Sequence, residues 1–385
     1  MQQTDVQRHN EDVQYLWEEF HRGNPSRVPV LFMMNPRLLL MDPAMSEGVS
    51  FADYFADPQI MLETQLRFHK WRRLSVWADW EMGLPKDRWD VVVVDYQNTG
   101  EGAWFGCDID FTGGMPRCVP FLQDKRELLH LEIEDPILGR CPQIWEAYQH
   151  INGRVAQGWE YEGAALSDVA SPFAGTDGPF TVAVQMRGAT EVCMDLYEDP
   201  GFVHDLLDFI TTQTIRRILA WGKATGHSYP VEGWYFADDC IQYLSLGHYR
   251  EFVLPYHKRL VEALSRGKNK IHLCGKVQHL LPTVRDELDI DLFNLGYPTD
   301  MGKLRKDLGP DVELQGNISP MLLYSGSPEA IVEAAKTLLE SGVTEGRRFL
   351  LCDGHNIVPH TPLENLAAMY EAGKRYGRYS NSCSQ

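Results

Sequence analysis

Residues 90–95, Asp-Val-Val-Val-Val-Asp, form the clearest β-strand signal in the chain. The run is apolar on both faces, which is typical of a strand in a parallel sheet that is covered on both sides. Parallel strands need long crossover connections, and these are usually helices. The stretch therefore favours an α/β fold, in which helices should alternate with further strands along the chain.

The second half of the sequence shows this alternation. Six strand-then-helix units predict a (β/α)8 TIM barrel, with long insertions in the first two units. A doubly wound open sheet is the rival, but no GxGxxG fingerprint follows an early strand. The predicted strands cover 180–185, 231–237, 270–274, 290–295, 312–316 and 347–352, and the predicted helices lie near 199–225, 246–266, 277–287, 300–308, 328–341 and 363–377.

The first half is less regular. Its pattern predicts a helix near 6–22, a buried strand over 28–33 and helical periodicity from about 53 to 80. No repeat, low-complexity tract or linker divides the chain. We therefore expect one domain over 1–385, with 1–27 as a helical extension and 28–378 as the barrel.

Composition excludes several classes of partner. The 385 residues contain 36 Lys+Arg and 54 Asp+Glu, and the net charge is −18. Such an acidic surface disfavours nucleic acid and anionic membranes. No apolar run approaches the length of a membrane span and the N-terminal stretch is polar, so we expect a soluble cytoplasmic protein. The eight cysteines are scattered, which argues against a disulfide framework.

Polar residues collect where the predicted strands end. In a (β/α)8 barrel the active site lies at the carboxyl ends of the strands, so their recurrence there indicates a site. A single polar residue at a strand end is usually a cap or a loop hydrogen bond. The residues concerned are Asp238, Asp239, His272, Cys274, Asn294, Gln315, Asn317, Cys352, Asp353 and His355.

His272 and Cys274 are candidate metal ligands. One residue separates them, so in a strand both side chains point to the same face. Imidazole nitrogen and thiolate sulfur suit zinc, and a catalytic zinc site has three protein ligands and one open position. The third ligand is either Cys352 or His355, while Asp238, Asp239 and Glu232 are weaker candidates. The alternative is a buried cysteine beside a histidine that bonds a backbone carbonyl.

Other side chains are candidates for handling substrate. Asp238 and Asp239 are placed to orient or deprotonate it, although at least one of them is expected to cap the following helix. Glu101 follows the 90–95 strand and is a candidate for the same work. Tyr96 and Trp234 are aromatic residues that could stack on an aryl ring. Their alternative role is in the hydrophobic core.

Several linked motifs carry a family resemblance. His272-Leu-Cys274-Gly, Gln315-Gly-Asn317-Ile-Ser-Pro and residues 354–365, Gly-His-Asn-Ile-Val-Pro-His-Thr-Pro-Leu-Glu-Asn, occur in this order. From about 180 to 378 the chain resembles the uroporphyrinogen decarboxylase superfamily, which implies a TIM barrel of that type. The superfamily has a decarboxylase branch and a branch of zinc- and corrinoid-dependent methyltransferases.

The decarboxylase branch is the poorer match. Its members carry an arginine-rich segment after the first strand, which grips the carboxylates of the porphyrinogen. The matching segment here has a single arginine, Arg37. An acidic protein with so few arginines is poorly suited to a substrate with eight carboxylates.

The methyltransferase branch typically shows His-x-Cys-Gly, as at His272 and Cys274, together with a later cysteine. This chain departs from that pattern, because His355 stands at the matching place and Cys352 lies three residues earlier. Either His355 or Cys352 supplies the third ligand, or there is no third ligand and no metal is bound. The resemblance also implies that Arg187 faces the site and could hold a substrate carboxylate. Asn317 belongs to a motif that implies substrate binding.

These observations predict a methyltransferase that works with a corrinoid protein. It exchanges a methyl group between that protein and either a small methylated substrate, such as a methoxylated aromatic compound, or a thiol. The resemblance implies zinc, methylcobalamin carried by the partner, and a homodimer as a candidate assembly. The alternative is a metal-free lyase or decarboxylase, in which an aspartate stabilises a developing cation and His355 transfers a proton. A third interpretation is a non-enzymatic protein that binds a corrinoid or another ligand but has lost catalytic activity.

Overall fold

The computed structural model describes residues 3–379, so Cys383 and the two ends of the predicted domain lie outside the described residues. Its centre is a parallel five-stranded sheet in the order β11-β10-β9-β8-β7. Each strand pairs in parallel with its neighbour, as the repeated strand-then-helix pattern predicts. The strands are β7 (Tyr235–Ala237), β8 (Asn269–Leu273), β9 (Ile290–Leu295), β10 (Glu313–Ile318) and β11 (Phe349–Asp353).

Three further segments extend this sheet into a (β/α)8 barrel. Val30 forms a parallel bridge with Leu351 beside β11. On the other side, β1 (Val92–Val93) pairs in parallel with β6 (Val169–Ala170), and the Ala237 N–H donates to the Thr176 carbonyl just beyond β6. Between β1 and the Val30 segment, the Gln65 side chain bonds both backbone groups of Val93 in place of a neighbouring strand.

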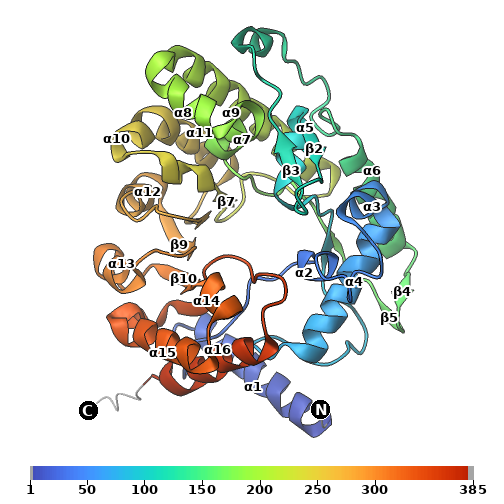
Figure 1. The fold of residues 1–385 in the computed structure, drawn as a ribbon, viewed down its shortest axis with the longest axis vertical. Coiled ribbons are helices and arrows are strands. Elements are labelled where there is room, and N and C mark those ends of the chain that lie inside the picture. The colour runs from blue at the N-terminus through green and yellow to red at the C-terminus, as the bar shows by residue number, and fades with distance from the viewer. Residues whose placement is uncertain (1–2, 380–385) are drawn as a thin grey trace.

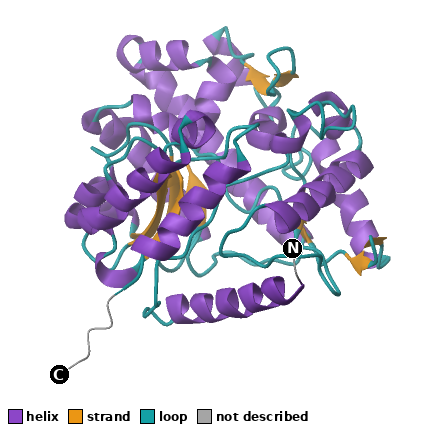
Figure 2. Ribbon diagram, turned by 60° about the horizontal axis from the view of Figure 1, so that its bottom comes forward, coloured by secondary structure: helices purple, strands orange, loops and turns teal. Residues whose placement is uncertain are grey.

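Helices follow the strands around the ring. Figure 1 shows the successive units side by side, and Figure 2 shows the strands enclosed by helices. This arrangement is that of a TIM barrel of the uroporphyrinogen decarboxylase-like type. The helices of the second half are α9 (Pro200–Ala224), α10 (Leu246–His248), α11 (Leu254–Leu264), α12 (Leu281–Leu288), α13 (Met301–Leu308), α14 (Pro320–Ser325), α15 (Pro328–Leu338) and α16 (Leu363–Tyr376).

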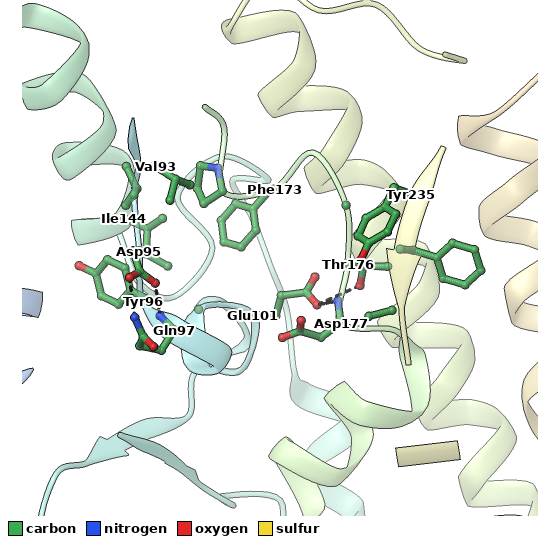
Figure 3. Close-up of a pocket in the computed structure, with 16 residues that line it drawn as sticks. Val93, Asp95, Tyr96, Gln97, Glu101, Ile144, Phe173, Thr176, Asp177 and Tyr235 are labelled. Carbon is green, nitrogen blue, oxygen red and sulfur yellow. Dashed lines mark hydrogen bonds between the residues drawn. The ribbon is translucent and has the colours of Figure 1, made fainter. Parts of the chain in front are cut away.

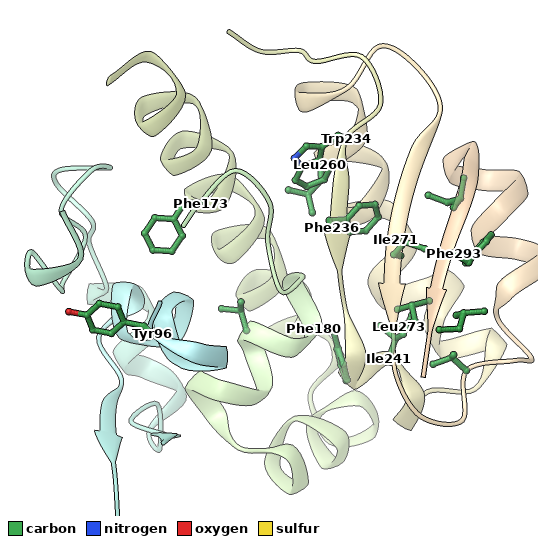
Figure 4. Close-up of a cluster of buried hydrophobic side chains, with 14 of the residues drawn as sticks. Tyr96, Phe173, Phe180, Trp234, Phe236, Ile241, Leu260, Ile271, Leu273 and Phe293 are labelled. Atoms are coloured by element: carbon green, nitrogen blue, oxygen red, sulfur yellow. The ribbon is translucent and has the colours of Figure 1, made fainter. Parts of the chain in front are cut away.

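The core lies between strands and helices. Phe236 of β7, Ile271 and Leu273 of β8 and Phe293 of β9 are at most 1% exposed, and on β8 the polar residues Lys270 and His272 alternate with the two apolar ones. Figure 4 shows this layer facing the helices, with Leu260 packed on the outer side of the sheet. Because side chains alternate along a strand, the residues between them point into the barrel. The same alternation therefore builds the core and directs polar groups inward.

The first half carries the insertions. The helix predicted near 6–22 is confirmed as α1, and the periodic stretch contains α4. No helix among the described residues is long and apolar enough to cross a membrane. The elements are α1 (Gln3–His21), α2 (Arg37–Leu40), α3 (Phe51–Ala56), α4 (Pro58–Ser75), α5 (Gly100–Phe105), α6 (Gln143–Ala156), α7 (Pro179–Arg187), α8 (Ala189–Glu198), β2 (Asp108–Asp110), β3 (Arg117–Val119), β4 (Glu160–Tyr161) and β5 (Ala164–Ala165).

One predicted strand is wrong, because residues 180–185 lie in helix α7. Pro179 starts this helix, and the carboxylate of Asp238 accepts hydrogen bonds from the backbone N–H groups of Phe180 and Thr181. Three of the six residues from 180 to 185 are buried, so the run has the apolar character of a strand. The barrel strand that precedes this helix is the two-residue β6.

Candidate functional site

Three side chains of metal-ligating types, two histidines and one cysteine, converge at the carboxyl ends of the strands. The Nε2 atom of His272 lies 3.2 Å from the Cys274 sulfur and 3.1 Å from the Nδ1 atom of His355. One ligand atom from each residue lies within 4.8 Å of the other two. Zinc in a tetrahedral site separates such ligands by about 3.3–3.6 Å, as its bond lengths imply. The donor set and its spacing therefore fit zinc with one position left for substrate.

The fold explains the convergence. His272 is the fourth residue of β8 and Cys274 directly follows that strand, so the two side chains share the inner face. His355 follows β11 after a short turn and has a φ of 101°. Such a backbone conformation is rare for residues with a side chain, and its occurrence at a site suggests functional selection.

A chain of amides fixes the orientation of His272. Its Nδ1 atom lies 2.5 Å from Oδ1 of Asn294, whose amide nitrogen donates to Gln315 at 3.2 Å. The Gln315 amide in turn donates to Glu313 at 2.7 Å. Because an amide oxygen only accepts, the hydrogen-bond network assigns the proton to Nδ1 of His272. The lone pair on Nε2 then faces the cluster, as a metal ligand requires.

The titration of the cluster also suits a metal. Burial, followed by the neighbouring His272 and Arg37, lowers the pKa of His355 to about 4, so the imidazole is neutral at pH 7. Burial and the neighbouring Asp239 raise the pKa of the Cys274 thiol. Without a cation the cysteine is thus protonated, and a bound metal would displace that proton.

Asp238 and Asp239 have different surroundings. Asp239 accepts a hydrogen bond from the backbone N–H of Cys274 at 2.7 Å and lies 3.7 Å from Nε2 of His272. Asp238 is fully buried and bonds His257 at 3.0 Å in addition to the start of α7. One of the pair thus holds a helix terminus as expected, but the helix precedes it in the chain. Asp239 is the one that adjoins the cluster.

Glu101 is tied to the scaffold. One carboxylate oxygen forms an ion pair with Arg217, and the other accepts from the Thr176 hydroxyl at 2.9 Å and the Asp177 backbone at 2.5 Å. Glu101 is 5% exposed and Arg217 is fully buried, with its guanidinium 4.3 Å from the centre of the Phe173 ring. Both oxygens of Glu101 therefore have structural partners.

The remaining predicted site residues make contacts within the scaffold. The guanidinium of Arg187 bonds Asp195 and two backbone carbonyls, and the Trp234 indole donates to Ala174. The Asn317 amide donates to the carbonyls of Gly296 and Thr299, and the Tyr96 hydroxyl donates to Phe55. Glu232 lies 3.8 Å from Arg266 at the surface. Of these residues, Tyr96 also lines the cavity described next.

Cys352 does not join the cluster, so of the two candidates for a third ligand only His355 lies beside His272 and Cys274. The Cys352 side chain is 1% exposed and packs with Phe20 and Leu350, beside Trp17 of α1. Its position in β11 is opposite Asn317 of β10. A strand-end position alone could not distinguish the two residues.

A cavity of about 330 Å³ lies between β1, the loop after β6, and β7, whose Ala237 pairs with His272 of β8. Figure 3 shows Asp95 and Tyr96 on one side and Tyr235, Thr176 and Asp177 on the other. Burial and then Asp239 and Cys274 raise the pKa of Tyr235, which places this ring in the field of the cluster. Sequence reasoning missed Asp177, whose signal was its place after the unrecognised strand β6.

The barrel and its inward-facing donors define a (β/α)8 protein with a candidate metal centre at the usual catalytic end. The family model described as Uroporphyrinogen decarboxylase (URO-D) matches residues 16–376. The chain therefore belongs to the uroporphyrinogen decarboxylase family, as the motif resemblance predicts.

Curated relatives agree with this assignment. The chain is 35% identical over 187 residues to a uroporphyrinogen decarboxylase of Coxiella burnetii (strain RSA 493 / Nine Mile phase I), covering 47% of this chain and 49% of the relative. It is 30% identical over 212 residues to that of Geobacter metallireducens, covering 53% of this chain and 60% of the relative. The chain thus spans about half the length of the first of these relatives.

A methyltransferase from Methanosarcina mazei has a similar fold. The TM-score is 0.64 with 21% sequence identity, and the match covers 94% of this chain and 98% of that one. The two proteins share the barrel along almost their whole lengths.

Proposed function

We propose that this protein is a zinc-assisted methyltransferase, which moves a methyl group between a small methylated substrate or thiol and a corrinoid protein. The convergence of His272, Cys274 and His355 carries the proposal, because imidazole and thiolate together are ligands that zinc prefers. The similarity of the fold to a methyltransferase is consistent with it.

His272, Cys274 and His355 would hold the zinc ion. When bound, zinc binds a thiol as its thiolate or polarises an ether or hydroxyl oxygen as a Lewis acid. The Asn294 amide keeps Nε2 of His272 directed at the site, and Asp239 holds the Cys274 backbone through its N–H. Asp239 also lies near enough to the cluster to take a proton from a substrate heteroatom.

A decarboxylase is the second candidate, because the two relatives compared above are uroporphyrinogen decarboxylases. The cavity disfavours a polyanionic substrate. Its lining contains Asp95, Glu101 and Asp177 and no lysine, arginine or histidine. A substrate with several carboxylates would meet repulsion there, where guanidinium groups would be needed.

Metal analysis and an activity assay test the proposal together. We expect about one zinc per purified chain, lost in His272→Ala and Cys274→Ser and retained in the control Cys352→Ser. Zinc below about 0.2 per chain and insensitive to both substitutions would overturn the zinc site. Methyl transfer to a reduced corrinoid that ends on chelation supports the methyltransferase, whereas release of CO₂ that survives exhaustive chelation supports the decarboxylase.

A further inference from the structure

The charge of the cavity is unbalanced. Its three lining carboxylates are Asp95, Glu101 and Asp177. Glu101 is neutralised by Arg217, and Asp95 accepts from Tyr54 and Gln97 in the field of Arg37. These two carboxylates have partners that the fold supplies.

Asp177 has a hydrogen bond from the Gln185 side chain but no cationic partner in the described part of the chain. Among residues 3–379, no lysine, arginine or histidine forms an ion pair with its carboxylate. Its nearest charged influences are Asp239 and Asp238, which are also acidic. Burial and these two neighbours raise the pKa of Asp177 to about 7. A carboxylate in this position lacks a counter-charge, which a ligand is free to provide.

Aromatic rings form other parts of the same wall. Tyr235 lies on β7 inside the barrel and is nevertheless 45% exposed, because its ring faces the cavity (Figure 3). Tyr96 and Phe173 line the wall as well. The face of an aromatic ring attracts a cation, and it attracts a methylated ammonium group especially, because methyl groups also pack on the ring.

We infer that the cavity binds a methylated ammonium ion, with Asp177 as its counter-charge and Tyr235 as its aromatic contact. The cavity volume of about 330 Å³ is sufficient for a small ion of this class. A neutral methoxylated compound would leave Asp177 without a counter-charge. The inference concerns the site of the proposed methyl transfer and rests on that function for its chemistry.

Transfer of a methyl group from such an ion conserves atoms and electrons. Removing a methyl group breaks one C–N bond, whose electron pair stays on nitrogen and leaves an uncharged tertiary amine. The electron pair for the new bond to the methyl carbon comes from the reduced corrinoid of the proposed function. The quaternary substrate is cationic at every pH, whereas the amine is uncharged at the moment it leaves the methyl carbon, so Asp177 and Tyr235 favour the substrate over this nascent amine until it takes up a proton from water.

Calorimetric titration of the full, zinc-free chain with choline tests the inference. The comparison ligand is the carbon analogue of choline, in which a tert-butyl group replaces trimethylammonium. We expect choline to bind at least about tenfold more tightly than this neutral analogue. Equal binding of the two, or no choline binding at millimolar concentration, would overturn the inference on the unmodified protein.

Three variants locate the binding. Asp177→Asn and Tyr235→Leu are each expected to weaken choline binding at least about tenfold, whereas Tyr235→Phe keeps the ring and stays within about twofold. Asp205→Asn removes the same charge from the exposed side of α9 and is the control. Unchanged choline affinity in both Asp177→Asn and Tyr235→Leu would place the ion elsewhere and refute the assignment.

The outcomes for binding and for function are separable. Choline binding without methyl transfer from any donor contradicts the proposed function and leaves the cavity assignment standing. Methyl transfer from a neutral donor, with no preference for choline over its carbon analogue, contradicts the cavity assignment and leaves the methyltransferase standing.

Discussion

Replacing Glu101 by glutamine should destabilise the protein by about 3 kcal/mol. The partner of Glu101 is Arg217, which is fully buried. This burial lowers the pKa of the Arg217 guanidinium. Removing one member of a buried ion pair typically costs about 3–5 kcal/mol, because the other charge remains in the interior. Glutamine retains one acceptor oxygen, and the ring of Phe173 still faces the guanidinium, so the lower end of this range applies.

The change in melting temperature follows from the size of the chain. Unfolding entropy of about 2.1 cal/mol/K per residue amounts to about 0.8 kcal/mol/K for 385 residues. A loss of about 3 kcal/mol therefore lowers the melting temperature by about 4 °C. Urea unfolding and calorimetry measure the two quantities independently.

A double variant isolates the charge. Glu101→Gln combined with Arg217→Met removes both charges and keeps the acceptor for Thr176, so most of the lost stability should return. The reasoning fails if the free energy of unfolding of Glu101→Gln is within about 0.5 kcal/mol of that of the unmodified protein. If that variant kept its stability but lost activity, Glu101 would act on substrate, as the sequence suggested.

Three further outcomes can be measured. Asn294→Leu removes the acceptor for Nδ1 of His272, so the affinity for zinc, measured by competition with a chelator, should fall about 10–100-fold. An unchanged affinity would contradict the orienting role of Asn294. Zinc uptake at pH 7 should release about one proton from Cys274, whose pKa is raised, and calorimetry in buffers of different ionisation enthalpy counts it; zero release would mean that the sulfur is not a ligand. The pKa of Asp177 is about 7 in the folded protein, above its unfolded value, so the contribution of this residue to stability is complete below about pH 4 and is lost as pH rises through 7. At pH 8 the Asp177→Asn variant should therefore be about 1–2 kcal/mol more stable than the unmodified protein in urea unfolding, and the difference should shrink toward pH 5.

The fold of the second half was predictable because its signals are local. Apolar alternation marks the strands β8 to β10 and a continuous apolar run marks β11, and each is followed by a helix with its own apolar face. The third barrel strand was missed because β6 has two residues, too few for a periodic pattern. Helix α7 was mistaken for it, since an apolar run buried in the core has the same composition in a strand or a helix.

The site was predictable only where short spacing determines geometry. His272 and Cys274 are two residues apart in a strand, so their common face follows from the sequence. The choice between Cys352 and His355 depends on the turn after β11, where a positive φ brings the histidine to His272. The bond between Glu101 and Arg217 joins residues 116 positions apart and has no local signal.

The net charge of −18 describes the whole chain, and it cannot show which acidic residues lack partners. Asp238 is the most deeply buried of the aspartates near the cluster, yet its oxygens are fully occupied by α7 and His257. Asp177 is less buried and has no cationic partner among the described residues. A buried and unpaired carboxylate reduces stability above its pKa, whereas asparagine at the same place would not. Its presence is therefore better explained by a positively charged ligand in the cavity than by any contribution to the fold.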